Sequence, residues 1–374
     1  MKMEQNSAPG IPVDTNNETR ASVNRENHMK QRKLGSTGLL VSQFALGCMT
    51  FGNEVNEAES NTIIDTFIGA GGTFFDTADC YHGGQSEYIL GRALKNRRDD
   101  FVIATKSGLR VGDGPNDIGA SAKHIIRSVE RSLGRLGTDY IDLHQIHCWD
   151  PETPAEETIA AMENLWRQGK VRYFGVSNQA GWQIASTYFT ALLRNAPAIA
   201  SVQAQYSLVE REVEREVIPV CQSLGLGLLP WGPLGGGFLS GKYHPTSEPP
   251  AGSRLAGSLP WMEEHWERRA TPQGWAVLEA VREVAAASGG TAAQVALAWL
   301  ARQPAVSSPI IGASCLAHAK DNLGACALDL SDEHLALLDR AGAITPQYPQ
   351  RFVDVAMHSR TDFVPERDAW IGLR

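Results

Sequence analysis

The chain has 374 residues, of which 43% are hydrophobic, and it carries a formal net charge of −8. A chain of this length can bury one large core or two ordinary ones, so length alone does not set the number of domains. The acidic balance argues against nucleic acid or an anionic membrane surface as the main partner. It leaves room for a local basic site that holds a phosphorylated ligand.

The six cysteines are scattered, with no CxxC pair and no metal-like cluster, which favours a reduced protein of the cytoplasm without a metal site. No stretch approaches the roughly 18 to 20 consecutive apolar residues of a membrane span, so we expect no membrane partner. Residues 1–30 are polar and lack the apolar run of a signal peptide. We expect 1–30 to be a disordered extension and 31–374, including the C-terminal tail, to form a single domain.

The folded part begins with two short strand-like pieces around the Gly-Ser-Thr-Gly turn at 35–38, which predicts a β-hairpin. Strand-like runs then alternate with helical patterns eight times. This order predicts an α/β fold with a parallel sheet, and eight units predict its closure into a (β/α)8 TIM barrel. The predicted strands are 44–48, 73–77, 101–106, 141–147, 171–177, 201–206, 226–231 and 309–312. The predicted helices are 57–69, 87–95, 122–136, 156–168, 182–194, 212–224, 292–302 and 317–326.

Two segments depart from this alternation of strands and helices. Residues 244–270 form a long Pro- and Gly-rich loop after the seventh barrel strand, followed by an extra helix at 272–287. Loops of this length inside a domain are usually functional or mobile. The tail after Ser331 starts with a capped helix and then turns irregular and aromatic, so it could fold across the barrel mouth.

Three ionisable side chains fall at or just after the ends of neighbouring predicted strands. Asp76 and Lys106 lie at two strand ends, and Tyr81 projects from the loop after the first of them. The carboxyl ends of parallel strands share one rim, where chemistry is placed in such folds. We predict that Lys106 stabilises the phenolate and lowers the pKa of Tyr81, while Asp76 holds the lysine.

His147 ends the next predicted strand and joins the same rim. Alternation along a strand places Gln145 and His147 on one face and His144 on the other, so a metal site built from the two histidines is disfavoured. Lys106 has a competing interpretation as a Schiff-base lysine of an aldolase-like barrel. The neighbouring Asp76 works against that role because it would keep the amine protonated.

Two later segments indicate a phosphate-bearing ligand. The run PWGPLGGGFLSGKY at 230–243 combines an aromatic side chain, a Gly-rich turn and a lysine, which suits stacking on a ring and folding backbone amides around a phosphate. The run at 309–323 reads as a strand, a Gly turn and a helix N-terminus, which is a common anion site. Both features indicate a phosphate without indicating a particular reaction.

Between residues 32 and 349 the chain contains, in this order, the motifs LGCMTFG, GGTFFDTADCYHGGQSE, ATK, IDLHQIH, FGVSN, VQAQYS, WGPLGGGFLSGKY and PIIGAS…DN. With them it resembles the aldo-keto reductase family, and within it the microbial and plant branch that includes β subunits of voltage-gated potassium channels. The resemblance implies an NADP-dependent oxidoreductase whose catalytic tetrad is Asp76, Tyr81, Lys106 and His147.

The same resemblance implies where the cofactor binds. Ser177, Asn178 and Gln203 would hydrogen-bond the nicotinamide carboxamide, and Trp231 would stack on the nicotinamide ring. The other implied cofactor residues line this pocket, cover the pyrophosphate or lie at the adenosine end: Gly47, Met49, Asp76, Gly232, Leu234, Lys242, Arg254, Gly312, Ser314, His318, Asp321 and Asn322.

Two positions differ from the family pattern. Relatives often carry Arg or Gln near the 2′-phosphate where this chain has His318, which bears on the choice between NADP and NAD. Relatives usually carry Tyr where this chain has His144, which we expect to face the helices without altering the mechanism.

We therefore predict NADPH-dependent reduction of aldehydes or ketones to alcohols, with Tyr81 as proton donor, a small carbonyl compound as substrate, and NADP preferred over NAD. The first alternative is a cofactor-binding, redox-sensing regulatory subunit with little turnover, and the second is a Schiff-base lyase that uses Lys106. Substrate choice depends on rim loops and the tail, for which Trp149, 244–270 and 347–363 are candidates. The sequence leaves the oligomeric state open.

Overall fold

Eight short parallel strands lie at the centre of the computed structural model, which describes residues 29–246, 248–249, 253–256 and 265–357. Their hydrogen-bonding order is β10-β3-β4-β5-β6-β7-β8-β9, and a parallel bridge between Leu228 and Val306 links the two ends. The predicted (β/α)8 TIM barrel is therefore confirmed, as a nearly closed barrel. The barrel strands are β3 (Ala45–Gly47), β4 (Phe74–Asp76), β5 (Val102–Ser107), β6 (Ile141–Ile146), β7 (Val171–Ser177), β8 (Ile199–Gln205), β9 (Gly227–Trp231) and β10 (Ile310–Gly312).

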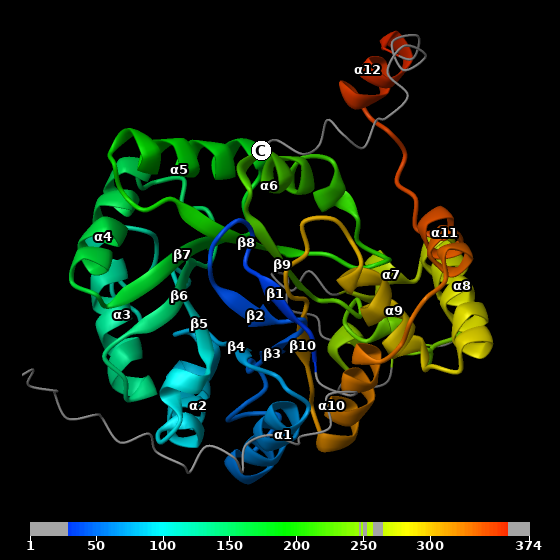
Figure 1. The fold of residues 1–374 in the computed structure, drawn as a ribbon, viewed down its shortest axis with the longest axis horizontal. Helices are drawn as coiled ribbons and strands as arrows, with labels where there is room; N and C mark the ends of the chain where they lie inside the picture. The colour runs from blue at the N-terminus through cyan, green and yellow to red at the C-terminus, as the bar shows by residue number, and fades with distance from the viewer. Residues whose placement is uncertain (1–28, 247, 250–252, 257–264, 358–374) are drawn as a thin grey trace, which may run out of the picture.

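Helices surround this barrel (Figure 1). Their ends follow local signals in the sequence. The Ser121 side chain accepts a hydrogen bond from the backbone N–H of His124 at the start of one helix, and Gly137 ends that helix with φ 65°. The helices are α1 (Glu57–Gly69), α2 (Gln85–Leu94), α3 (Ala122–Leu136), α4 (Ala155–Arg167), α5 (Gly181–Leu193), α6 (Val217–Leu224), α7 (Trp266–Arg269), α8 (Pro272–Ser288), α9 (Ala292–Ala301), α10 (Leu316–Leu323), α11 (Asp332–Ala341) and α12 (Gln350–Ala356).

The predicted N-terminal hairpin is present and closes the amino-terminal end of the barrel. Strands β1 (Gln31–Lys33) and β2 (Leu40–Ser42) pair antiparallel around the predicted turn. The backbone N–H of Ser36 donates to the carbonyl of Gly225, just before β9 begins. Ser42 Oγ accepts from the backbone of Thr73 and Phe74 where β4 begins. Because the hairpin occupies this end, the opposite, carboxyl end of the barrel is left for a site.

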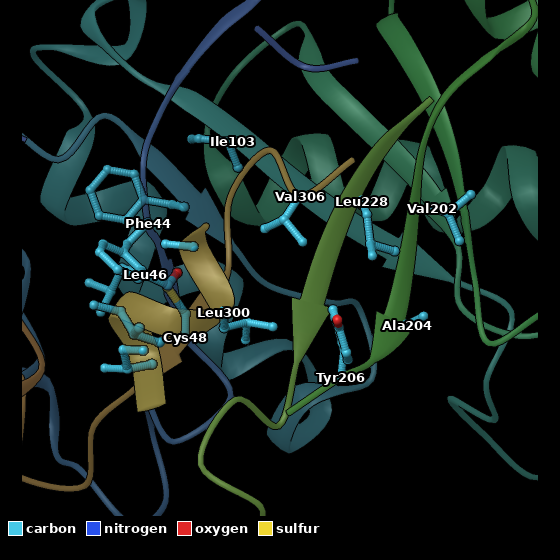
Figure 2. Close-up of a cluster of buried hydrophobic side chains, with 14 of the residues drawn as sticks. Phe44, Leu46, Cys48, Ile103, Val202, Ala204, Tyr206, Leu228, Leu300 and Val306 are labelled. Atoms are coloured by element: carbon cyan, nitrogen blue, oxygen red, sulfur yellow. The ribbon is translucent and has the colours of Figure 1, made fainter. Parts of the chain in front are cut away.

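An apolar layer between strands and helices holds the barrel together. Figure 2 shows Leu46, Val202 and Leu228 from three strands in one cluster with Leu300 of α9 and with Val306. Leu228 and Leu300 have no exposed surface. Burying a side chain of this size stabilises the fold by roughly 1.5 to 3 kcal/mol, so this layer fixes where the strand ends lie.

One predicted helix is shorter than expected. The sequence predicted a helix over 212–224, but the structure has a 3-10 turn at Glu212–Glu214 and begins α6 at Val217. Pro219 explains the difference, because it has no N–H to donate and its ring is tolerated only in the first turn of a helix.

The C-terminal tail differs from the irregular segment that the sequence predicted. It forms α12, which stands away from the barrel in Figure 1 instead of crossing its mouth. The tail contacts the body of the protein through Gln350, whose side chain donates to the carbonyl of Arg215. The side chains along α12 are exposed.

Several sequence predictions fall on residues outside the described ranges. They include 1–28 of the predicted extension, parts of the 244–270 loop and the end of the tail. Met29 is described and is buried, with its N–H donating to the carbonyl of Ala70. In the described residues no helix is by itself long and apolar enough to cross a membrane; α8 and α9 meet that length and composition only together, across a 97° bend.

Candidate active site

The carboxyl ends of neighbouring strands bring several predicted site residues to one level. In the parallel ladders Gly47 lies opposite both Asp76 and Gly312. A side chain at Gly47 would place its Cβ 2.8 Å from Ile310, so glycine is required where these strands approach. The sheet thus sets the residues of three separate motifs side by side.

Lys106 and Asp76 form a buried ion pair at this level. Lys106 Nζ lies 2.5 Å from Asp76 Oδ1 and donates to the Thr77 carbonyl at 2.8 Å. The ammonium also lies 3.3 Å from the hydroxyl of Tyr81. Burial alone would lower the pKa of Lys106, but the Asp76 carboxylate and Tyr81 outweigh it, so the pKa is raised and the amine stays charged.

Two glutamine amides complete the surroundings of Asp76. Its Oδ2 accepts from Gln203 Nε2 at 2.8 Å and from Gln145 Nε2 at 3.2 Å. Gln203, which the family resemblance assigned to the nicotinamide carboxamide, therefore donates to the carboxylate here. Gln145 was not among the predicted site residues, although strand alternation had already placed it on the face of His147.

Tyr81 is carried by a tight turn between β4 and α2. The 3-10 turn Tyr81–Gly84 contains left-handed conformations at His82, Gly83 and Gly84, with φ between 49° and 89°. The φ of 89° at Gly84 favours glycine, and a Cβ there would also lie 2.6 Å from the Arg135 side chain, which would have to move. The turn directs the Tyr81 hydroxyl back toward Lys106.

The pKa of Tyr81 differs from the prediction. Burial raises the pKa of Tyr81 to about 12, and the Lys106 ammonium offsets only part of that rise. The predicted lowering was wrong for this structure because desolvation of the phenolate exceeds the attraction of a lysine already paired with Asp76. The phenol is therefore protonated at neutral pH and available as an acid.

His147 lies beside Tyr81, with the two rings edge to face and their centroids 5.8 Å apart. Its backbone N–H donates to Ser107, and its carbonyl accepts from the Asn178 side chain. Burial, with the nearby Lys106 ammonium, holds the pKa of His147 well below its usual value, so the imidazole is neutral. Cys80, which the sequence analysis did not single out, contacts its Nδ1 with Sγ at 3.8 Å.

His144, which lies within β6, has different neighbours from those of His147. Its Nε2 is 3.0 Å from Ser107 Oγ, and its ring meets Phe174 edge to face. Burial lowers the pKa of His144 to about 3.

Three of the predicted nicotinamide-binding residues are joined by hydrogen bonds. Asn178, in the left-handed region at φ 52°, donates to Ser177 Oγ and accepts from the indole N–H of Trp231 at 3.0 Å. Trp231 is half-buried at the end of β9. The indole is thereby held at the rim by a defined partner. Met49, which follows β3, is 39% exposed.

The Gly-rich loop after β9 is built from left-handed glycines. Gly232 has φ 64°, and Gly235, Gly236 and Gly237 follow with φ of 57°, 66° and 90°. Leu234 is half-buried within this loop. Two basic residues flank it. Lys242 is exposed, and Arg254 lies 3.8 Å from Glu54.

The residues predicted for the adenosine end gather around α10. Ser314 Oγ lies 3.0 Å from His318 Nδ1, and Asn322 donates to the Gly312 carbonyl. Among the described residues, the side chain at the N-cap of α10, Cys315, makes no capping hydrogen bond. The first N–H groups of such a helix can bind an anion. Asp321 turns instead toward α9, where its carboxylate accepts hydrogen bonds from Thr291 and Gln294.

These features fit a nicotinamide dinucleotide. A hydroxyl, an amide and an indole lie near the tetrad for the nicotinamide, while the glycine loop and an uncapped helix end supply backbone N–H groups for phosphates.

Comparisons with known proteins identify the family. Residues 43–343 match the model of the Aldo/keto reductase family. The chain is 37% identical over 322 residues to YrpG, an uncharacterized oxidoreductase of Bacillus subtilis (strain 168), covering 83% of this chain and 95% of that relative. The chain belongs to the aldo-keto reductase family.

Other aldo-keto reductase relatives carry different names. A probable voltage-gated potassium channel subunit beta of Oryza sativa subsp. japonica is 37% identical over 291 residues, which cover 76% of this chain and 88% of the relative. Norsolorinic acid reductase A of Aspergillus parasiticus is 32% identical over 351 residues, which cover 90% and 87%. The family resemblance drawn from the motifs is thus confirmed. Reduction of carbonyl compounds with NAD(P)H is the general reaction of this family.

Proposed function

We propose that this aldo-keto reductase reduces an aldehyde or ketone to an alcohol with NADPH and that Tyr81 donates the proton. The observation that carries the proposal is the contact of the Lys106 ammonium with both the Asp76 carboxylate and the Tyr81 hydroxyl. A protonated phenol beside a fixed cation can give up its proton to a substrate oxygen while the cation stabilises the phenolate left behind.

Each member of the tetrad has a separate task. The bound nicotinamide supplies the hydride for the carbonyl carbon. Tyr81 donates its proton to the carbonyl oxygen as negative charge develops there, and Lys106 stabilises the resulting phenolate. Asp76 keeps Lys106 charged and in place. Neutral His147 donates a hydrogen bond to the same oxygen and orients the carbonyl.

The cofactor assignment follows the residues around the tetrad. Ser177 and Asn178 would hold the carboxamide, and Trp231, fixed by its bond to Asn178, would stack on the nicotinamide ring. The glycine loop and α10 would hold the phosphates. Lys242 and Arg254 flank that loop and support NADPH over NADH, with His318 at the adenosine end.

A regulatory role is the second candidate, and its support is the similarity to a relative named as a probable potassium channel subunit beta. In that case the site would bind the cofactor with little turnover. The Schiff-base alternative has less support, because a Schiff base requires a neutral amine and Lys106 is held as an ammonium by Asp76.

Three further predictions stand as proposals of the same kind. We propose that 31–374 act as one domain and that the protein works in the cytoplasm, where its six free cysteines would stay reduced. We also propose that a small carbonyl compound, and no nucleic acid, is its partner in the reaction.

Replacing Tyr81 by Phe tests the proposed function. The ring remains and the hydroxyl is lost, so kcat should fall by roughly 10²- to 10⁴-fold across a panel of aldehydes, while NADPH affinity stays unchanged. Tyr88→Phe, on the exposed side of α2, serves as the matched control. Retention of more than about a tenth of wild-type kcat in Tyr81→Phe would exclude Tyr81 as the acid. Wild-type turnover indistinguishable from buffer, with NADPH still bound, would favour the regulatory role.

A further inference from the structure

Cys80 precedes the turn that carries Tyr81, and among the described residues its side chain is the one within hydrogen-bonding distance of a ring nitrogen of His147. Its Sγ lies 3.8 Å from His147 Nδ1, within hydrogen-bonding reach of sulfur. The other ring nitrogen, Nε2, has no hydrogen-bond partner among the described residues. One nitrogen of this imidazole is therefore engaged by the protein, and the other is left for a ligand.

The position of the thiol is fixed by the backbone on both sides of it. The N–H of Asp79 donates to the Lys106 carbonyl at 3.0 Å, and the N–H of Tyr81 donates to the Ala78 carbonyl at 3.3 Å. The first of these bonds ties the turn to the strand that carries Lys106. Cys80 thus has the same rigid support as Tyr81.

The protonation states of both partners favour one direction for this hydrogen bond. Burial, together with the Asp79 carboxylate, raises the pKa of the Cys80 thiol to about 12, so the sulfur keeps its hydrogen. His147 is neutral, and a neutral imidazole carries its single proton on either Nδ1 or Nε2. A thiol can donate to an unprotonated Nδ1, and an imidazole nitrogen is a better acceptor than sulfur.

We propose that Cys80 is a positioning residue whose S–H donates to Nδ1 of His147 and thereby places the imidazole proton on Nε2, facing the substrate oxygen. This inference rests on the proposed function for its catalytic consequence. Without the thiol, part of the His147 population would carry its proton on Nδ1, and that part could not donate to the carbonyl. The partner of a ring nitrogen selects the histidine tautomer in the same way in metal and proton-transfer sites.

The test reads the tautomer directly. Protein labelled with ¹⁵N-histidine is observed by long-range ¹H–¹⁵N correlation, without substrate, and the signals of His147 are assigned by their loss in His147→Gln. The wild type should show a protonated Nε2 and an unprotonated Nδ1. Cys80→Ala should show a mixture of tautomers, and Cys80→Ser, which keeps a donor, should restore the wild-type pattern. Cys326→Ala, a half-buried cysteine next to α10, should leave the pattern unchanged.

Kinetics give the second measurement. Loss of one weak hydrogen bond should lower kcat of Cys80→Ala by about two- to fivefold with no change in KM for NADPH, and Cys80→Ser should recover most of the loss. An Nδ1-protonated His147 in the wild type would overturn the proposal even if Cys80→Ala did not fold. So would an unchanged tautomer in a folded Cys80→Ala.

Failure of the proposed function would look different. A wild-type protein without carbonyl turnover would remove that function, whereas the tautomer spectra would still show whether Cys80 sets the proton position on His147.

Discussion

The Nζ atom of Lys106 lies 2.5 Å from Oδ1 of Asp76, and the two side chains are 0% and 4% exposed, respectively. An ion pair this deeply buried is stable only while both partners remain, because either charge left alone would have no solvent to stabilise it. The pair therefore links the stability of the fold to the chemistry of the rim.

Replacing Asp76 by Asn should remove one charge and leave the Lys106 ammonium buried. We expect the free energy of unfolding to fall by on the order of 3 to 5 kcal/mol, measured by urea denaturation at pH 7. Asp329→Asn is the matched control, since Asp329 is 91% exposed in its pair with Arg302 and should change stability by less than about 1 kcal/mol. Equal effects of the two substitutions would contradict the importance of the buried pair.

Asp79 should make stability depend on pH. Burial and the Glu87 carboxylate raise its pKa from 3.8 to about 7. Between these values the folded protein holds a proton that the unfolded chain has released, so the free energy of unfolding should fall as pH rises. The side chain of Asp79→Asn cannot ionise. Between pH 4.5 and 7.5 the free energy of unfolding should therefore fall by roughly 2 to 4 kcal/mol less in Asp79→Asn than in the wild type.

The measurement is urea denaturation of the wild type and Asp79→Asn at several pH values. Subtracting one curve from the other removes the contribution of groups that titrate in both proteins. Asp113→Asn, an exposed position, should follow the wild type at every pH. Parallel curves for the wild type and Asp79→Asn would show that the Asp79 carboxyl has an ordinary pKa in the folded protein.

Trp231 should contribute to cofactor affinity. Trp231→Ala removes a large flat surface. It also removes the hydrogen bond that the indole N–H donates to the Asn178 side chain. We expect the Kd for NADPH to rise by about tenfold, by analogy with other buried aromatic contacts. Quenching of the remaining tryptophan fluorescence measures the affinity, and Trp166→Ala on the outer helix α4 provides the control. An unchanged Kd would place the nicotinamide ring away from Trp231.

The two basic residues beside the glycine loop should set the cofactor preference. Charge-assisted hydrogen bonds to a phosphate contribute on the order of 1.5 to 3 kcal/mol each, so one good contact gives a preference of about tenfold or more for NADPH over NADH. Lys242→Met and Arg254→Met should each reduce that preference, and added salt should reduce it in the wild type. Equal affinities for the two cofactors at low salt would show that these residues do not reach the extra phosphate.

The class of fold and the family could be predicted from the sequence because both depend on local patterns. Eight alternations of apolar strand and amphipathic helix have few parallel arrangements other than a barrel, and the hairpin was indicated by its turn residues. The positions of Asp76, Lys106 and His147 at strand ends were likewise visible, since the carboxyl ends of parallel strands meet at one rim.

Only the tertiary structure decided which side chains contact one another there. Gln145 and Gln203 come from different strands, and the sequence contains no signal that both donate to one oxygen of Asp76. The direction of the Tyr81 pKa depended on a balance between burial and charge that spacing along the chain cannot supply. The contact of Cys80 with His147 joins residues 67 positions apart, and it arises because the turn that carries Tyr81 is fixed against the strand that carries Lys106.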